Sequence, residues 1–161
     1  MDHRLRGALM VFVLLVIQTT FLPFFSVGGF LPDLVLIWLV YTAIRRGQVE
    51  ATVAGFVVGL AEDLLATQLF GLAALSKTVA GFFAGYFHNE NKTDQTLGSY
   101  QFVLIVGLGS LVHNFIFYTI FLQATDVPLL WTVLYYSAAT TLYTGIISVL
   151  PMFAFARRVT A

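Results

Sequence analysis

Long apolar runs separated by short polar breaks dominate the pattern along the chain. Six runs stand out, covering residues 5–25, 31–44, 49–67, 70–87, 99–123 and 129–155. A helix needs about 20 apolar residues to cross the hydrocarbon core of a bilayer, and it satisfies its own backbone hydrogen bonds there. The runs are apolar on all sides rather than alternating, which argues against a β-barrel. We predict an all-α integral membrane protein, a bundle of six transmembrane helices in a single transmembrane domain over residues 1–161.

The second run is short for a full crossing. It leaves two alternatives open: a helix that starts after Pro32, or one that begins near Phe24 and is interrupted at Gly28, Gly29 and Pro32. The polar stretch His88–Thr96 is predicted to be a solvated turn between the fourth and fifth runs.

Composition supports placement in lipid. Only 10% of the 161 residues are charged and 59% are hydrophobic, whereas a soluble domain carries roughly a quarter of its residues as Asp, Glu, Lys or Arg. The eight basic and eight acidic residues sum to a net charge of zero. So few charged residues exclude a basic nucleic-acid binder and a disordered chain, because both need abundant charge. There is no cysteine, and therefore no disulfide framework or thiolate chemistry.

Basic residues fall in alternate connections. They lie before the first run, between the second and third, between the fourth and fifth, and after the sixth: Arg4, Arg6, Arg45, Arg46, Lys92, Arg157 and Arg158. The other connections (23–31, 68–69 and 124–128) contain no Lys or Arg. Because Lys and Arg in short loops stay on the cytoplasmic side, both termini are predicted to be cytoplasmic. No small-residue cleavage site follows the first run, so we do not expect a cleaved signal peptide.

Polar residues within the runs gather in the predicted outer half of the membrane. Glu62 and Asp63 lie about one turn before the end of the third run, and Lys77 lies two turns into the fourth. An ion pair between Lys77 and either carboxylate is therefore predicted. The same outer half holds further polar side chains: Gln18, Thr19, Thr20, His113 and Asn114. One interpretation is that these groups satisfy one another and fix helix register. The other is a cavity or docking surface open to the outside.

Other candidate positions have simpler explanations. Asp33 follows Pro32 at the start of the second run, and we interpret it as a helix cap. Two pairs of glycines with a spacing of four, Gly55 with Gly59 and Gly81 with Gly85, predict close helix packing against a neighbour within the chain or in a partner.

Catalytic signatures are missing from the sequence. There is no zinc-protease, hydrolase or phosphate-loop motif and no acid cluster spaced for a metal. Ser76 beside Lys77 is a poor dyad, since adjacent helical residues point about 100° apart. We predict a protein that is not an enzyme and that has no cofactor and no metal.

An ordered series of motifs in the first half of the chain resembles the rod shape-determining protein MreD family. The series covers residues 31–87 and consists of Pro32-Asp33-Leu34-Val35-Leu36-Ile37, Tyr41-x-Ala43-x-Arg45-Arg46-Gly47, Gly55-Phe56-x-x-Gly59-Leu60-x-x-Asp63-Leu64, Gly71-Leu72-x-Ala74-Leu75 and Gly85-Tyr86. The positions that match the family pattern are Pro32, Asp33, Arg46, Gly47, Gly55, Gly59, Asp63, Gly71 and Ala74. One departure is Glu62, where the family would have an apolar residue.

The resemblance implies a non-enzymatic component of the bacterial cell-wall elongation machinery in the inner membrane. Its implied partners are MreC, RodA, the elongation transpeptidase and MreB filaments. The implied fold is similar to that of the substrate-binding component of energy-coupling-factor transporters. The alternative function is such a component itself, binding a small molecule or vitamin at the outer polar cluster.

Overall fold

The computed structural model describes residues 3–66, 69–124 and 128–159, and within these ranges the chain forms helices and no strands. The all-helical prediction is therefore confirmed. The elements are α1 (His3–Thr20), η1 (Leu22–Phe25), α2 (Leu34–Arg46), α3 (Gln48–Ala66), α4 (Leu72–Ala84), η2 (Gly85–Phe87), α5 (Thr93–Leu97), α6 (Tyr100–Phe121), η3 (Leu122–Ala124) and α7 (Leu129–Val159). Each of the six apolar runs overlaps one of the longer helices: α1, α2, α3, α4, α6 and α7.

The helix boundaries decide one open alternative, in favour of a second helix that starts after Pro32, and differ from the prediction at two other places. The second run does not form a helix from Phe24 into α2, because Gly28 and Gly29 adopt positive φ values of 62° and 86° and the segment between Ser26 and Asp33 turns instead. The stretch predicted as a solvated turn contains the short helix α5, which starts at Thr93. The fourth run becomes helical only at Leu72, after Gly71. Residue 67, the predicted end of the third run, lies outside the described residues.

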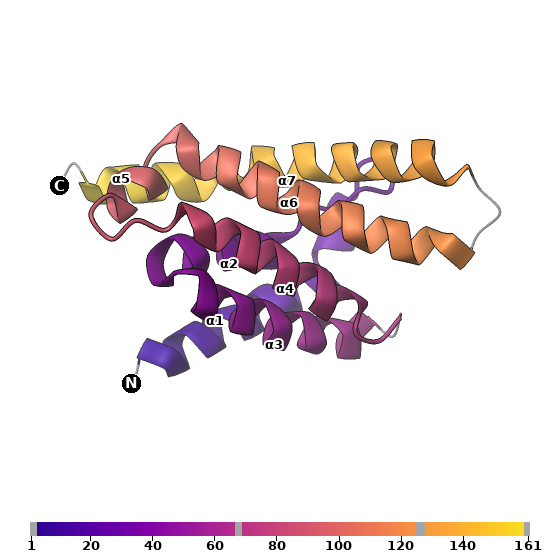
Figure 1. Ribbon diagram of the computed structural model, residues 1–161, viewed down its shortest axis with the longest axis horizontal. Helices are drawn as coiled ribbons and strands as arrows, with labels where there is room; N and C mark the ends of the chain where they lie inside the picture. The colour runs from indigo at the N-terminus through magenta and orange to yellow at the C-terminus, as the bar shows by residue number, and fades with distance from the viewer. Residues whose placement is uncertain (1–2, 67–68, 125–127, 160–161) are drawn as a thin grey trace.

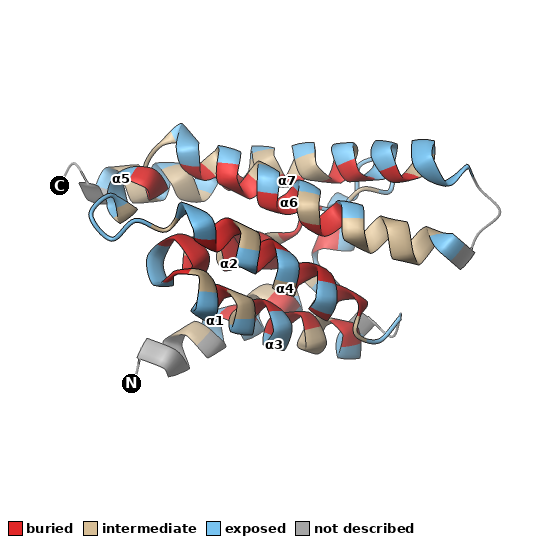
Figure 2. Cartoon of the chain, in the orientation of Figure 1, coloured by how far each residue is buried: buried red, intermediate tan, exposed pale blue. Residues whose placement is uncertain are grey.

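Two antiparallel hairpins and a central helix build the molecule (Figure 1). One hairpin is α3 with α4 and the other is α6 with α7; α4 packs on α6 and joins the two. Helix α2 contacts α1, α3, α4, α6 and α7, and its side chains Val35, Leu36, Leu39 and Val40 are completely buried. The buried residues face the middle of the assembly, while outward faces are exposed (Figure 2).

Glycines allow α3 and α4 to lie in backbone contact. A Cβ atom on Gly55 would lie 2.5 Å from the Lys77 carbonyl oxygen, and one on Gly81 would lie 2.6 Å from the Ala51 carbonyl oxygen. Gly59 lies against the backbone of Ala74 in the same way, and Gly85 against Gln48. Both glycine pairs thus face the partner helix of the same hairpin, which is the close approach that small residues permit in membrane bundles.

The outward faces carry large apolar side chains. Val49 is 79% exposed and Trp131 is 75% exposed, and Phe12 and Leu150 are also exposed. Such a surface would aggregate in water and is suited to lipid. Among the described helices, two are long and apolar enough by length and composition to cross a membrane, over Tyr100–Phe121 and Leu129–Arg157; Leu9–Thr20 and Leu72–Phe87 are shorter apolar helices.

The connections that carry basic residues lie at one end of the molecule. Arg45, at the end of α2, forms an ion pair of 3.0 Å with Asp94 in α5, and the His88 Nδ1 lies 2.7 Å from the Ile44 carbonyl oxygen. The beginning of α1, the end of α7 and α5 lie toward this same end of the long axis (Figure 1). This arrangement matches the alternation of basic and non-basic connections in the sequence.

Candidate functional site: a buried charge cluster

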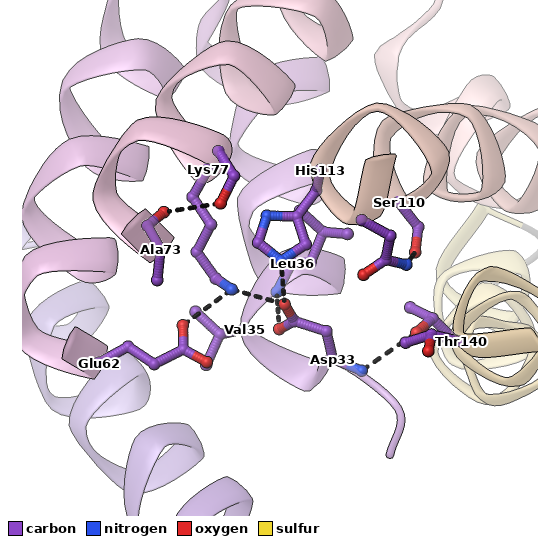
Figure 3. Close-up of polar contacts among 12 residues, drawn as sticks. Asp33, Val35, Leu36, Glu62, Ala73, Lys77, Ser110, His113 and Thr140 are labelled. Atoms are coloured by element: carbon purple, nitrogen blue, oxygen red, sulfur yellow. Dashed lines mark hydrogen bonds and ion pairs between the residues drawn. The ribbon is translucent and has the colours of Figure 1, made fainter. Parts of the chain in front are cut away.

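Asp33 is the point where the helices meet. Its Oδ1 accepts a hydrogen bond of 2.8 Å from the Leu36 N–H, which caps α2, as the sequence predicts. Its Oδ2 lies 2.5 Å from the Lys77 Nζ of α4, and its backbone N–H donates to the Thr144 Oγ1 of α7 at 3.1 Å. The capping interpretation was therefore incomplete: the same carboxylate is also the main partner of Lys77 (Figure 3).

Lys77 is 1% exposed and has two carboxylate partners. Besides Asp33, its Nζ lies 2.8 Å from the Glu62 Oε2 of α3. An ammonium group removed from water costs several kcal/mol unless it is paired and hydrogen-bonded, and two acids on two different helices provide that pairing.

Gln18 of α1 extends the network. Its Nε2 donates to the Glu62 Oε1 at 2.8 Å, and its Oε1 accepts from the Val35 N–H at 3.1 Å. His113 of α6 approaches from the other side, with its Nε2 3.5 Å from the Asp33 Oδ2. We call Asp33, Glu62, Lys77 and His113 the charge cluster. Through the cluster, Gln18 and Thr144, all six longer helices are linked.

The predicted ion pair between Lys77 and one of the two neighbouring carboxylates forms with Glu62. Asp63 does not take part in the charge cluster. Asp63 instead accepts hydrogen bonds from the Gly71, Ala73 and Ala74 N–H groups at 3.0, 3.0 and 3.1 Å. The first N–H groups of a helix have no partner within it. The N-cap residue, Gly71 at φ +92°, has no side chain to accept these hydrogen bonds. The Asp63 carboxylate, in the last turn of α3, caps α4 instead.

The other predicted polar residues lie apart from the charge cluster. The Asn114 Nδ2 donates to the Ser110 Oγ at 3.1 Å and to the Thr141 Oγ1 at 3.2 Å, which joins α6 to α7. The Thr19 hydroxyl bonds to its own helix at the Leu15 carbonyl, and Thr20 is exposed. The Ser76 hydroxyl bonds to the Leu72 carbonyl at 2.9 Å, so it forms no dyad with Lys77.

The remaining residues of the family pattern have local structural roles. Pro32 is buried just before the α2 cap. Gly47 ends α2 at φ +86°, and a Cβ atom added to it would lie 3.3 Å from the His88 Cδ2. Arg46 forms an exposed ion pair of 3.2 Å with Glu50. Ala74 contributes its N–H to Asp63 and its backbone to the contact with Gly59.

The geometry favours a stabilising role over a chemical one. Two carboxylates surround one ammonium group, and His113 lies beside Asp33, so these polar groups contact one another inside the bundle (Figure 3). In the described part of the chain, no group of three His, Asp or Glu side chains is placed to hold a metal ion.

Fold, exterior and site together define an all-helical membrane protein whose polar groups are gathered inside the bundle. Its family follows from sequence comparison: the model of the rod shape-determining protein MreD family matches residues 3–159. The chain belongs to the MreD family, as its motif series indicated, and this membership supports a role in determining rod shape. The family is one of shape-determining structural membrane proteins. No curated protein and no solved structure matches the chain, so similarity to energy-coupling-factor components stays a prediction.

Proposed function

We propose that this chain is a six-pass protein of the bacterial inner membrane with both ends in the cytoplasm, and that it serves as a non-enzymatic component of the cell-wall elongation machinery. In this role it binds MreC and, through the assembly, RodA, the elongation transpeptidase and MreB filaments. The observation that carries the proposal is the family match over residues 3–159.

The arrangement of the helices supports the proposed topology. Arg45 and Lys92 belong to connections that meet at one end of the bundle, where Arg45 pairs with Asp94. Chain segments on the cytoplasmic side of a membrane are enriched in Lys and Arg. Because α1 starts and α7 ends toward that same end (Figure 1), we expect an even number of crossings.

The polar side chains inside the bundle contact one another, which leaves the outer surface and the loops for binding other proteins. The described loops contain no folded extramembrane unit larger than the five-residue α5, so partners must be met by the lipid-facing surface or by short loops. The glycine pairs already lie in the contact between α3 and α4, so we expect a partner helix to bind on another face.

The transporter-subunit alternative rested on an outer polar cavity. In the structure, the polar side chains that would line it bind one another: Lys77 pairs with Asp33 and Glu62, and Asn114 bonds to Ser110 and Thr141. These contacts favour the interpretation in which polar groups fix helix register.

Depletion in a rod-shaped host tests the proposal. Cells that lose the protein should become round, and expression of the wild-type chain should restore rods. Cells that stay rod-shaped after complete depletion, but lose uptake of a vitamin, would overturn the proposal in favour of the transporter subunit.

A further inference from the structure

A groove of about 420 Å³ opens between α1 and α7, away from the charge cluster. Its floor is a stripe of α2 that includes Ile37, Trp38 and Tyr41, and its walls include Leu14 of α1 with Leu150 and Phe155 of α7. Helices α1 and α7 each pack on α2, but their described residues do not pack on each other. The face of α2 that lies between them is therefore uncovered. The lining is almost entirely apolar.

An aromatic wall and a cation close one end of the groove. The Tyr41 and Phe155 rings stack with centroids 5.1 Å apart, and Phe102 meets Phe155 edge-on at 5.9 Å. The Arg45 guanidinium lies over the Tyr41 ring at 5.4 Å from its centroid. Arg45 follows Tyr41 by one helical turn, so it continues the stripe of α2 that forms the floor.

Arg45 retains donors for a further anionic partner. Its ion pair with Asp94 joins two exposed side chains and uses one terminal nitrogen, and such pairs contribute little to stability. A guanidinium has five N–H donors and is suited to bidentate binding of phosphate.

The lining distinguishes between two possible occupants. Close docking of a transmembrane helix uses Gly, Ala and Ser at the contact, whereas this groove is lined by Met, Leu, Ile, Trp, Tyr, Phe and Pro. Bulky apolar walls that lead to an arginine at the membrane surface are suited to a flexible acyl chain with an anionic headgroup, since basic pockets between transmembrane helices bind such headgroups.

We infer that the groove between α1 and α7 is a binding site for an anionic phospholipid, with an acyl chain along Ile37, Trp38 and Leu150 and the phosphate at Arg45. The site is separate from the charge cluster and does not depend on which partner proteins the chain binds.

Two matched pairs of variants test the site. Leu150→Trp fills the groove, and Ile146→Trp adds the same bulk on α7 at a position of nearly equal exposure, 67% against 69%, that does not line the groove. Arg45→Gln removes the proposed phosphate ligand; Arg46→Gln removes an equally exposed neighbouring charge that pairs with Glu50.

The experiment is photolabelling of the full chain in nanodiscs, with phosphatidylglycerol or phosphatidylcholine that carries a diazirine in one acyl chain. We expect phosphatidylglycerol to label α2 and α7 peptides of the groove preferentially. Leu150→Trp should abolish this labelling and Ile146→Trp should keep it. Arg45→Gln should lower apparent affinity for phosphatidylglycerol about fivefold, the effect expected of one basic side chain at an anionic surface, and Arg46→Gln should not.

Three results would overturn the inference. The first is equal labelling by the two lipids, and the second is labelling spread evenly over all outward faces, which indicates bulk lipid only. The third is cross-linking of the groove residues to a protein helix in native membranes, which would make the groove a partner interface.

Discussion

Replacing Lys77 by methionine should destabilise the protein strongly. The substitution keeps an unbranched side chain of similar length, but it leaves the Asp33 and Glu62 carboxylates facing each other without the ammonium group that lies 2.5 and 2.8 Å from them. Breaking a buried ion pair by removing one partner costs about 3–5 kcal/mol. For a chain of this size, that corresponds to a fall in the unfolding midpoint of roughly 6–20 °C.

The assay is thermal unfolding of the purified protein in one detergent, followed by the loss of monodisperse protein on size exclusion. Lys92→Met is the matched control, since Lys92 is exposed at the start of α5 and its side chain makes no capping hydrogen bond. It should leave the midpoint within about 1–2 °C, as expected for a surface substitution.

A rescue variant separates stranded charge from lost packing. Combining Lys77→Met with Asp33→Asn and Glu62→Gln removes both carboxylates, and it should recover most of the lost stability because neutral replacement of a complete buried ionic group is often tolerated. Lys77→Met with an unchanged midpoint, or a triple variant less stable than Lys77→Met alone, would refute the assignment of the ion pairs.

Three further predictions concern helix ends and contacts, each read out by the same unfolding assay. Asp63→Ala should lower the free energy of unfolding by about 2 kcal/mol, because it removes the acceptor of three N–H groups at the start of α4. The control is Asp94→Ala at an exposed position, which should lower it by less than about 1 kcal/mol. Equal losses of stability in the two variants would contradict the capping role of Asp63. Gly55→Ala should destabilise by about 1–3 kcal/mol through overpacking against the Lys77 carbonyl. The control is Gly107→Ala, where no atom lies within 4 Å of the new Cβ, and it should be neutral or stabilising. A Gly107→Ala variant less stable than Gly55→Ala would rule out the close contact between Gly55 and Lys77. Asn114→Leu should cost about 1 kcal/mol as the hydrogen bonds between α6 and α7 are lost, and an unchanged midpoint would show that they contribute nothing.

The positions of the longer helices could be predicted from the sequence because lipid is a demanding solvent. A backbone in hydrocarbon must bond within its own segment, so the apolar runs coincide with α1, α2, α3, α4, α6 and α7. The same argument cannot find α5, which is short and polar and is held by the Arg45–Asp94 ion pair and by packing on α7. Its formation depends on a tertiary contact that hydropathy does not contain.

The sequence predicted how deep in the membrane the charged residues lie, but not which way their side chains point. Counting residues from the membrane surface placed Lys77 level with Glu62 and Asp63, but adjacent helical residues point about 100° apart, and which of the two faces Lys77 depends on how α3 packs on α4. Asp33 was missed because its capping role already accounted for the carboxylate. One signal could have pointed to Asp33: a buried lysine ammonium has several donors, so a second carboxylate partner besides Glu62 was to be expected.

Affinity purification of the tagged, full-length chain from native membranes of a rod-shaped bacterium tests the proposed function most directly. The account predicts that MreC-like and RodA-like proteins are recovered with the wild-type chain, and that recovery falls with Lys77→Met in proportion to the loss of folded protein. Recovery of a paired ATPase with a coupling subunit, and of no wall-synthesis protein, would contradict it.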